Sequence, residues 1–114
     1  MALKLNRASS APKTLTIAVG ATDSDVLVLD GFAMGMVFLP STFDGTTVTF
    51  KCCDTYGGTY VVLEDSSGNV VTVTTAASQC FALPEAVFGA PFGKLVAGSA
   101  QTDTDTLIKV TMRG

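Results

Sequence analysis

Nucleophilic chemistry has few candidate residues in this chain of 114 residues, because histidine is absent. Without histidine there is no Ser-His-Asp or Cys-His catalysis and no imidazole base. Three cysteines remain, Cys52, Cys53 and Cys80. A cysteine nucleophile would need another activating group, and Cys52 and Cys53 lie in the middle of an expected strand. The sequence therefore argues against a catalytic thiol.

The same three cysteines bear on metal binding and on disulfides. Neighbouring strand residues point to opposite faces of a sheet, so only one of Cys52 and Cys53 could meet Cys80 across a core. A zinc site would need more ligands than these residues supply. We expect three reduced thiols, with Cys52 as a small core side chain, and no metal or cofactor.

Carboxylates alternate with hydroxyls in two polar segments, at Asp23 and Asp25 and again at Asp103 and Asp105. Alternating carboxylates in a loop can supply the oxygen ligands that Ca²⁺ prefers. The twelve-residue spacing of an EF-hand is missing, so solvated turn carboxylates are the favoured interpretation. The sequence leaves cation binding at these loops open.

A glycoside hydrolase would need a pair of carboxylates, for which Glu64, Asp65 and Glu85 are the candidates. Glu64 and Asp65 stand at the mouth of an expected hairpin, where charged residues are common. We therefore expect no catalytic residues and no enzymatic activity.

Two tyrosines, Tyr56 and Tyr60, flank the glycine pair Gly57 and Gly58. An exposed tyrosine has a flat apolar face and a polar tip, which suits stacking on a sugar ring. A tyrosine at the rim of a core is the commoner role, so ligand stacking at Tyr56 and Tyr60 remains an alternative.

Two apolar segments, residues 32–39 and 88–92, could lie outside the core. If they do, they form a patch that needs a partner. Core burial explains Phe88 and Phe92 equally well, and residues 32–39 could be a strand covered on both sides. Because 47% of the chain is hydrophobic, we expect a homo-oligomer. Gly35 within the first segment indicates a bulge or a close backbone approach.

Short strands must position these residues, because apolar and polar residues alternate along most of the chain. The expected strands cover residues 14–19, 26–29, 32–39, 46–53, 59–64, 70–75, 79–83, 94–97 and 106–112. One helical turn is expected from Pro84 to Phe88. Many short strands at even spacing predict an all-β sandwich or barrel.

The alternation also predicts which side chains face the core. The residues expected to point inward are Thr46, Val48, Phe50, Cys52, Phe81, Leu83, Ile108, Val110 and Met112. The opposite face of the fourth strand, with Thr47, Thr49, Lys51 and Cys53, is expected to face water.

A single domain fits the length of the chain, with residues 1–13 as an extended N-terminal arm and residues 14–114 as the β-sandwich domain. The net charge of −3 and the scattered basic residues argue against nucleic acid and anionic membranes as partners. No apolar run approaches the roughly 20 residues that span a bilayer, and the N-terminus does not have the pattern of a signal peptide.

Four short motifs follow one another along the chain. They are a Leu-Pro-x-x-Phe-x-Gly-Thr-x-Val-x-Phe segment, a Val-Thr-Val segment, a Leu-Pro element and a Lys-Leu-Val-x-Gly-x-Ala segment. Their residues are Leu39, Pro40, Phe43, Gly45, Thr46, Val48, Phe50, Val71, Thr72, Val73, Leu83, Pro84, Phe88, Lys94, Leu95, Val96, Gly98 and Ala100. In this order the motifs resemble those of small virion proteins of tailed bacteriophages.

The resemblance implies a jelly-roll-like sandwich of about eight strands that decorates a phage capsid as a cement protein. It implies the major capsid protein as partner, a homotrimer as the favoured oligomer, and a place on the capsid surface after assembly in the host cytoplasm. No site residue is carried over from the family, because the matched positions are core and turn positions.

A capsid or oligomer interface is expected at the apolar residues of the arm and of the two apolar segments. These residues are Leu3, Leu5, Phe32, Met34, Met36, Phe88 and Phe92. The alternative function is a carbohydrate-binding or receptor-binding module of a tail or baseplate, with Tyr56 and Tyr60 as stacking residues.

Overall fold

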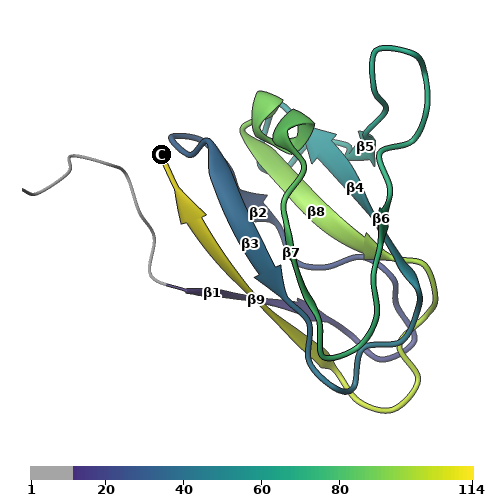
Figure 1. Cartoon of the computed structure of the whole chain (residues 1–114). Helices are drawn as coiled ribbons and strands as arrows, with labels where there is room; N and C mark the ends of the chain where they lie inside the picture. Colours follow the sequence, from purple (N-terminus) through teal and green to yellow (C-terminus); the bar gives the residue numbers. More distant parts are fainter. Residues whose placement is uncertain (1–11) are drawn as a thin grey trace, which may run out of the picture.

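The computed structural model describes residues 12–114, which form two antiparallel sheets in one sandwich (Figure 1). The all-β sandwich expected from the alternation is confirmed. It has nine strands, as many as the ranges that the alternation predicts and one more than the about eight of the expected jelly roll. The elements are β1 (Lys13–Ile17), β2 (Leu27–Val28), β3 (Met34–Phe38), β4 (Thr47–Cys53), β5 (Val61–Val62), β6 (Val73–Thr74), β7 (Cys80–Ala82), the 3₁₀ helix η1 (Glu85–Gly89), β8 (Phe92–Ala97) and β9 (Thr106–Arg113).

The first sheet, sheet I, has the strand order β1-β9-β3-β7, and the second, sheet II, has the order β2-β8-β4-β5 with β6 also paired to β4. With β5 and β6 counted as one interrupted strand, each sheet has four strands. The chain crosses between the two sheets at nearly every connection. This winding is that of a jelly roll, which is built from two Greek keys.

Alternation along β9 shows how the core is made. Ile108, Val110 and Met112 are buried, whereas Leu107 and Lys109, which alternate with them, are exposed. In sheet II, Val48 and Phe50 of β4 are each 1% exposed. The period of two therefore places one face of each sheet in the core, as expected.

Several expected positions differ in the structure. Val19 is 53% exposed because β1 ends at Ile17, and Thr46 is exposed because it precedes β4. Cys52 points inward but is only half-buried, because it lies at an open end of the sandwich.

Of the two alternatives left open for residues 32–39, a strand covered on both sides by the described residues is not what the structure shows. Only one face of β3 packs on the core, through Val37, and the side chains of Met34, Met36 and Phe38 are exposed.

Both β5 and β6 run antiparallel to β4, along the same edge. On β4, Lys51 pairs with Val62 and Val48 pairs with Val73. Lys51 and Val48 are 3 positions apart, but Val62 and Val73 are 11 apart, so the strand that pairs with β4 contains 8 extra residues. The strands expected at residues 59–64 and 70–75 are therefore the two ends of one interrupted strand.

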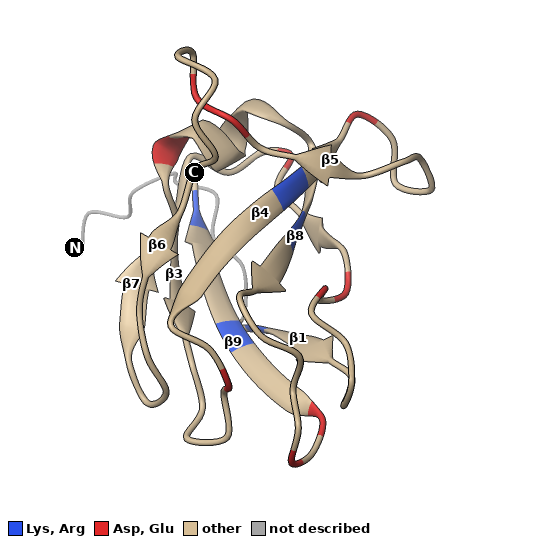
Figure 2. Cartoon of the chain, turned by 90° about the vertical axis from the view of Figure 1, so that its right-hand side faces the viewer, with Lys and Arg blue, Asp and Glu red and all other residues tan. Residues whose placement is uncertain are grey.

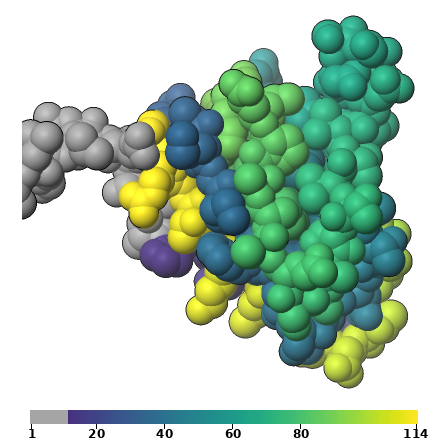
Figure 3. All heavy atoms as spheres, in the orientation of Figure 1, coloured from purple at the N-terminus to yellow at the C-terminus, as the bar shows by residue number. Residues whose placement is uncertain are grey.

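The extra residues make a projecting hairpin, defined here as residues 61–72. It is bridged between Glu64 and Val70, and the Asp65 carboxylate accepts hydrogen bonds from the backbone N–H groups of Ser67 (2.8 Å) and Asn69 (3.0 Å). The tip of the hairpin projects beyond the edge of sheet II (Figures 1 and 3).

Two local predictions are confirmed. A Cβ atom on Gly35 would lie 2.8 Å from the carbonyl oxygen of Thr111, so the glycine marks a close backbone approach. The expected helical turn is η1, which Pro84 precedes. Strand β1 begins at Lys13, within the segment expected to be an arm, and residues 1–11 of that arm lie outside the described residues. In residues 12–114, no helix is long and apolar enough to span a membrane.

Candidate functional site

The outer side of sheet I carries an exposed apolar surface that residues 12–114 leave open. From β3 it contains Met34, Met36 and Phe38, which are 49%, 37% and 44% exposed. From β7 it contains Cys80 and Ala82, which the strand register places beside Phe38 and Met36. We call these five residues the β3 face. Flexible methionines and an aromatic ring suit contact with another protein surface.

Cations border the β3 face on its β9 side. Lys109 is the register partner of Phe38, and Arg113 is the register partner of Met34. Together with Lys13 of β1, they are the charged residues in the strands of sheet I. The face is therefore apolar and cationic, although the whole chain has a net charge of −3.

All ten carboxylates lie between the named strands, mostly in the connections at the two ends of the sandwich (Figure 2). They are Asp23, Asp25, Asp30, Asp44, Asp54, Glu64, Asp65, Glu85, Asp103 and Asp105. The strands of sheet I carry three cations and no carboxylate. An acidic surface would therefore be electrostatically complementary to this sheet.

A hollow of about 240 Å³ lies on the β3 face between Met34, Met36, Ala82, Thr111 and Arg113, with Gly35 at its floor. Its walls are mainly hydrocarbon, so it suits an apolar side chain of a partner.

Of the seven interface residues expected from the sequence, the structure brings Met34 and Met36 together on the β3 face. Phe32 and Phe88 are partly buried against the core instead. Phe92 lies in β8 of sheet II, beside Tyr56, and Leu3 and Leu5 lie outside the described residues. Phe38, Cys80 and Ala82 were missed, although the period of two from Met34 would have found Phe38.

The two tyrosines of the alternative function lie close together. Tyr56 is 63% exposed and meets Phe92 edge to face, with ring centroids 5.7 Å apart. The hydroxyl of Tyr60 donates a 2.7 Å hydrogen bond to the carbonyl of Tyr56, and Lys94 Nζ lies 4.8 Å from the centre of the Tyr60 ring. Lys94 therefore occupies one face of Tyr60, and Tyr56 is the more accessible ring.

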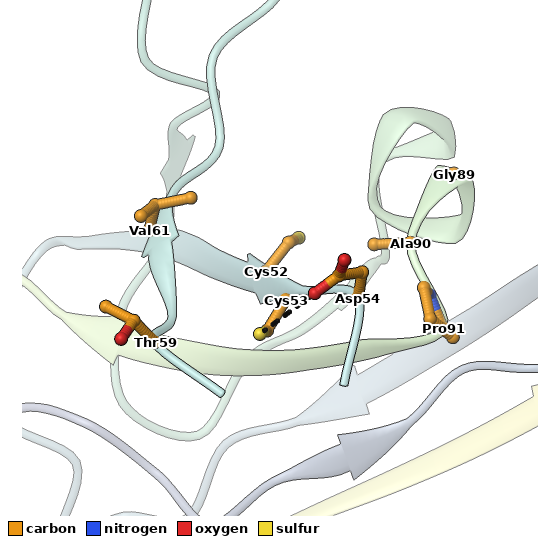
Figure 4. Close-up of a pocket in the computed structure, with 8 residues that line it drawn as sticks. All are labelled: Cys52, Cys53, Asp54, Thr59, Val61, Gly89, Ala90 and Pro91. Atoms are coloured by element: carbon orange, nitrogen blue, oxygen red, sulfur yellow. Dashed lines mark hydrogen bonds between the residues drawn. The ribbon is translucent and has the colours of Figure 1, made fainter. Parts of the chain in front are cut away.

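Two of the three free cysteines line a pocket of about 370 Å³ at one end of sheet II (Figure 4). The thiol of Cys53 lies 3.7 Å from Asp54 Oδ1, and the apolar segment Gly89, Ala90 and Pro91 forms the opposite wall. Partial burial raises the pKa of Cys52, which favours the protonated thiol over the reactive thiolate. The environment of Cys52 therefore does not activate its thiol as a nucleophile.

Several loop carboxylates bind their own chain. Asp25 accepts a hydrogen bond from the backbone N–H of Thr16 (3.0 Å), and Asp105 accepts one from Val19 (3.0 Å). Asp23 forms a 2.8 Å ion pair with Lys51. Within the described part of the chain, no three side chains of the metal-binding types gather in one place. These loops therefore use carboxylates to fix their backbone.

The surface that stands out is thus the β3 face, which offers contact area and positive charge to another molecule. It has the exposed methionines and aromatic ring that are typical of protein contacts. Comparison with known proteins adds nothing to this description: no family model, no curated protein and no solved structure matches the chain.

Proposed function

We propose that this protein is a virion structural protein of a tailed bacteriophage, which decorates the capsid as an oligomer and stabilises the shell. The observation that carries the proposal is the β3 face, where Met34, Met36 and Phe38 expose apolar surface on a small sandwich. Contiguous apolar surface of this kind is typical of contacts between proteins.

The rest of the chain supports the same function. A jelly-roll sandwich supplies a rigid body with broad faces, and many copies on a symmetric shell bind more tightly than one copy does. The segment before β1 contains Leu3 and Leu5 alternating with polar residues. We propose that this segment lies along the major capsid protein and adds strand hydrogen bonds to it.

Counting copies in the phage particle tests the proposal. The band of this protein on a denaturing gel is compared by densitometry with the band of the major capsid protein. Hundreds of copies per particle support decoration of the shell, because a shell offers a site at each of its many symmetric positions. A few copies per particle would contradict it.

The alternative function, a carbohydrate-binding or receptor-binding module of the tail or baseplate, is favoured by the exposure of Tyr56 beside Phe92. A tail role predicts a few to a few dozen copies per particle. It also predicts that Tyr56→Ala lowers adsorption of the phage to its host, while a decoration role leaves adsorption unchanged.

A further inference from the structure

We propose that the β3 face of one copy binds the projecting hairpin of a second copy, so that the copies associate head to tail. The inference rests on the self-association part of the proposed function and does not involve binding to the capsid. It assigns both sides of the contact to described residues of this chain.

The hairpin carries the negative charge that the β3 face lacks. Val62 and Val70 are 48% and 45% exposed. They share a face with Glu64, because Val70 is bridged to Glu64 and Val62 lies two residues before it. The hairpin contains the carboxylates of Glu64 and Asp65, and no lysine or arginine occurs anywhere between Lys51 and Lys94. The hairpin is therefore an apolar and acidic surface.

The β3 face presents the opposite charge around similar apolar groups. Lys109 and Arg113 border Phe38 and Met34, and no carboxylate lies in the strands of sheet I. Packing two β3 faces against each other would bring only cations to the contact, which like-charge repulsion disfavours. The acidic hairpin is the better occupant, because its valines can cover the methionines while its carboxylates meet the cations.

The hairpin cannot reach the β3 face of its own molecule. It projects beyond β5 on the side of sheet II, whereas β3 and β9 lie in the other sheet (Figures 1 and 3). The contact must therefore join two copies. Because two different surfaces meet, the association is heterologous, and it gives a closed ring if the rotation between copies closes.

The pairing of β5 and β6 with β4 does not require residues 64–71. Removing the eight residues from Glu64 to Val71 would leave Leu63 opposite Phe50 and Val73 opposite Val48, so that β5 and β6 become one continuous strand in register. Thr72 would then face outward opposite Thr49, with the alternation preserved. An insertion that interrupts a strand but is dispensable for pairing is free to serve a contact.

Sedimentation velocity of the purified protein tests the proposal without any capsid. We expect a concentration-dependent oligomer that weakens as salt is added, since the contact includes opposite charges. Glu64→Lys on the hairpin and Lys109→Glu beside the β3 face should each weaken association by about tenfold or more. The two substitutions in one chain restore an opposite pair, so association should return to within about threefold of the unmodified protein.

Variants that change the apolar part or the hairpin as a whole complete the test. Met36→Glu should abolish association, whereas Val28→Glu, at a similarly exposed valine of β2, should leave it unchanged. Deleting residues 64–71 should give a folded monomer. A seven-residue deletion of residues 64–70 is the matched control for folding, because it reverses the alternation of β6 and should destabilise the domain.

Cysteine crosslinking locates the contact directly. Ser66→Cys at the hairpin tip should form an intermolecular disulfide with Cys80 of the β3 face under mild oxidation, and Cys80→Ser should remove it. Ser99→Cys, in an exposed loop between β8 and β9, should give no such product.

Three results would overturn the proposal. The first is a monomer at every concentration up to about 0.5 mM. The second is an oligomer that Met36→Glu abolishes but that Glu64→Lys and the eight-residue deletion leave intact, which would show that two β3 faces meet. The third is a β3 face that binds phage heads as a monomer. Failure of head binding alone would overturn only the proposed function.

Discussion

At the scale of single residues, the best-connected polar side chain is Gln101, which is 1% exposed. Its Oε1 accepts hydrogen bonds from the Asp44 backbone N–H (3.0 Å) and the Thr106 hydroxyl (2.6 Å). Its Nε2 donates to the carbonyls of Asp44 (3.0 Å) and Ser99 (3.2 Å). One amide thus joins the β3–β4 loop to the β8–β9 loop, and nothing in the sequence pattern distinguishes Gln101 from a solvated loop residue.

We predict that Gln101→Leu lowers the free energy of unfolding by about 2–4 kcal/mol, because it leaves the partners in Asp44 and Thr106 without hydrogen bonds in the interior. Urea denaturation monitored by circular dichroism measures the change. Gln79→Leu is the matched control, since Gln79 is exposed, and it should change stability by less than about 0.5 kcal/mol. Equal effects of the two substitutions would contradict the role given to Gln101.

The ion pair of Asp23 and Lys51 makes stability depend on pH. Partial burial alone would raise the pKa of Asp23, but the hydrogen bond and the charge of Lys51, with smaller effects from Thr22 and Lys94, hold it below its usual 3.8. A carboxylate whose pKa is lowered by folding stabilises the protein above its unfolded pKa. That contribution is lost as the pH falls through the folded pKa.

We therefore predict that Lys51→Met costs at most about 1 kcal/mol near pH 6, because both side chains are about one third exposed. The difference from the unmodified protein should shrink as the pH is lowered to about 2.5 and Asp23 becomes protonated. Urea denaturation at the two pH values measures it. A difference that stays constant would show that the ion pair is not its cause.

At the scale of elements, β3 is an inner strand of sheet I with one face on the core and the other exposed. It pairs with β9 on one side and β7 on the other, and it presents the β3 face outward. Gly35 lets it approach β9 closely, since a Cβ there would meet the Thr111 carbonyl at 2.8 Å and Leu83 Cδ1 at 2.9 Å. The backbone of β9 cannot move away without disturbing its pairing with β1.

We predict that Gly35→Ala lowers the free energy of unfolding by about 1–3 kcal/mol through overpacking against β9. Thermal and urea denaturation measure the loss. Gly57→Ala serves as the control, because a Cβ at Gly57 would have no neighbour within 4 Å. If Gly35→Ala proved as stable as the control, β3 and β9 would be less closely packed than described.

At the scale of the whole molecule, the strands of sheet I carry only positive charge, whereas the carboxylates lie outside the named strands. The strands of sheet I carry Lys13, Lys109 and Arg113 without a carboxylate, and the segment before β1 adds Lys4 and Arg7. The remaining charges are ten carboxylates and two lysines, Lys51 and Lys94. A molecule with such separated charges has a preferred orientation toward charged partners.

We predict that a variant lacking residues 1–12 folds with an unchanged melting temperature but binds phage heads poorly. The first buried residue of the described core is Leu15, and pairing of β1 with β9 begins at Lys13. Thermal denaturation and cosedimentation with heads measure the two outcomes. Unchanged head binding would remove the N-terminal segment from the proposed function, and loss of folding would make that segment part of the domain.

The sequence alone determined the fold class, most of the strands and the side chains that share a face. These properties are local, since a period of two is visible within a few residues, as in Ile108, Val110 and Met112. Gly35 and the helical turn after Pro84 were recognised for the same reason.

Only the tertiary structure decided which shared faces are covered. Alternation places Met34, Met36 and Phe38 on one side of β3, but whether another layer lies over them depends on strands distant in sequence. The same holds for the interruption between β5 and β6, which the local pattern shows as two strands and which only the register against β4 reveals. Gln101 is buried because two loops 57 residues apart meet around it, and pairings at such separations leave no periodic signal in the chain.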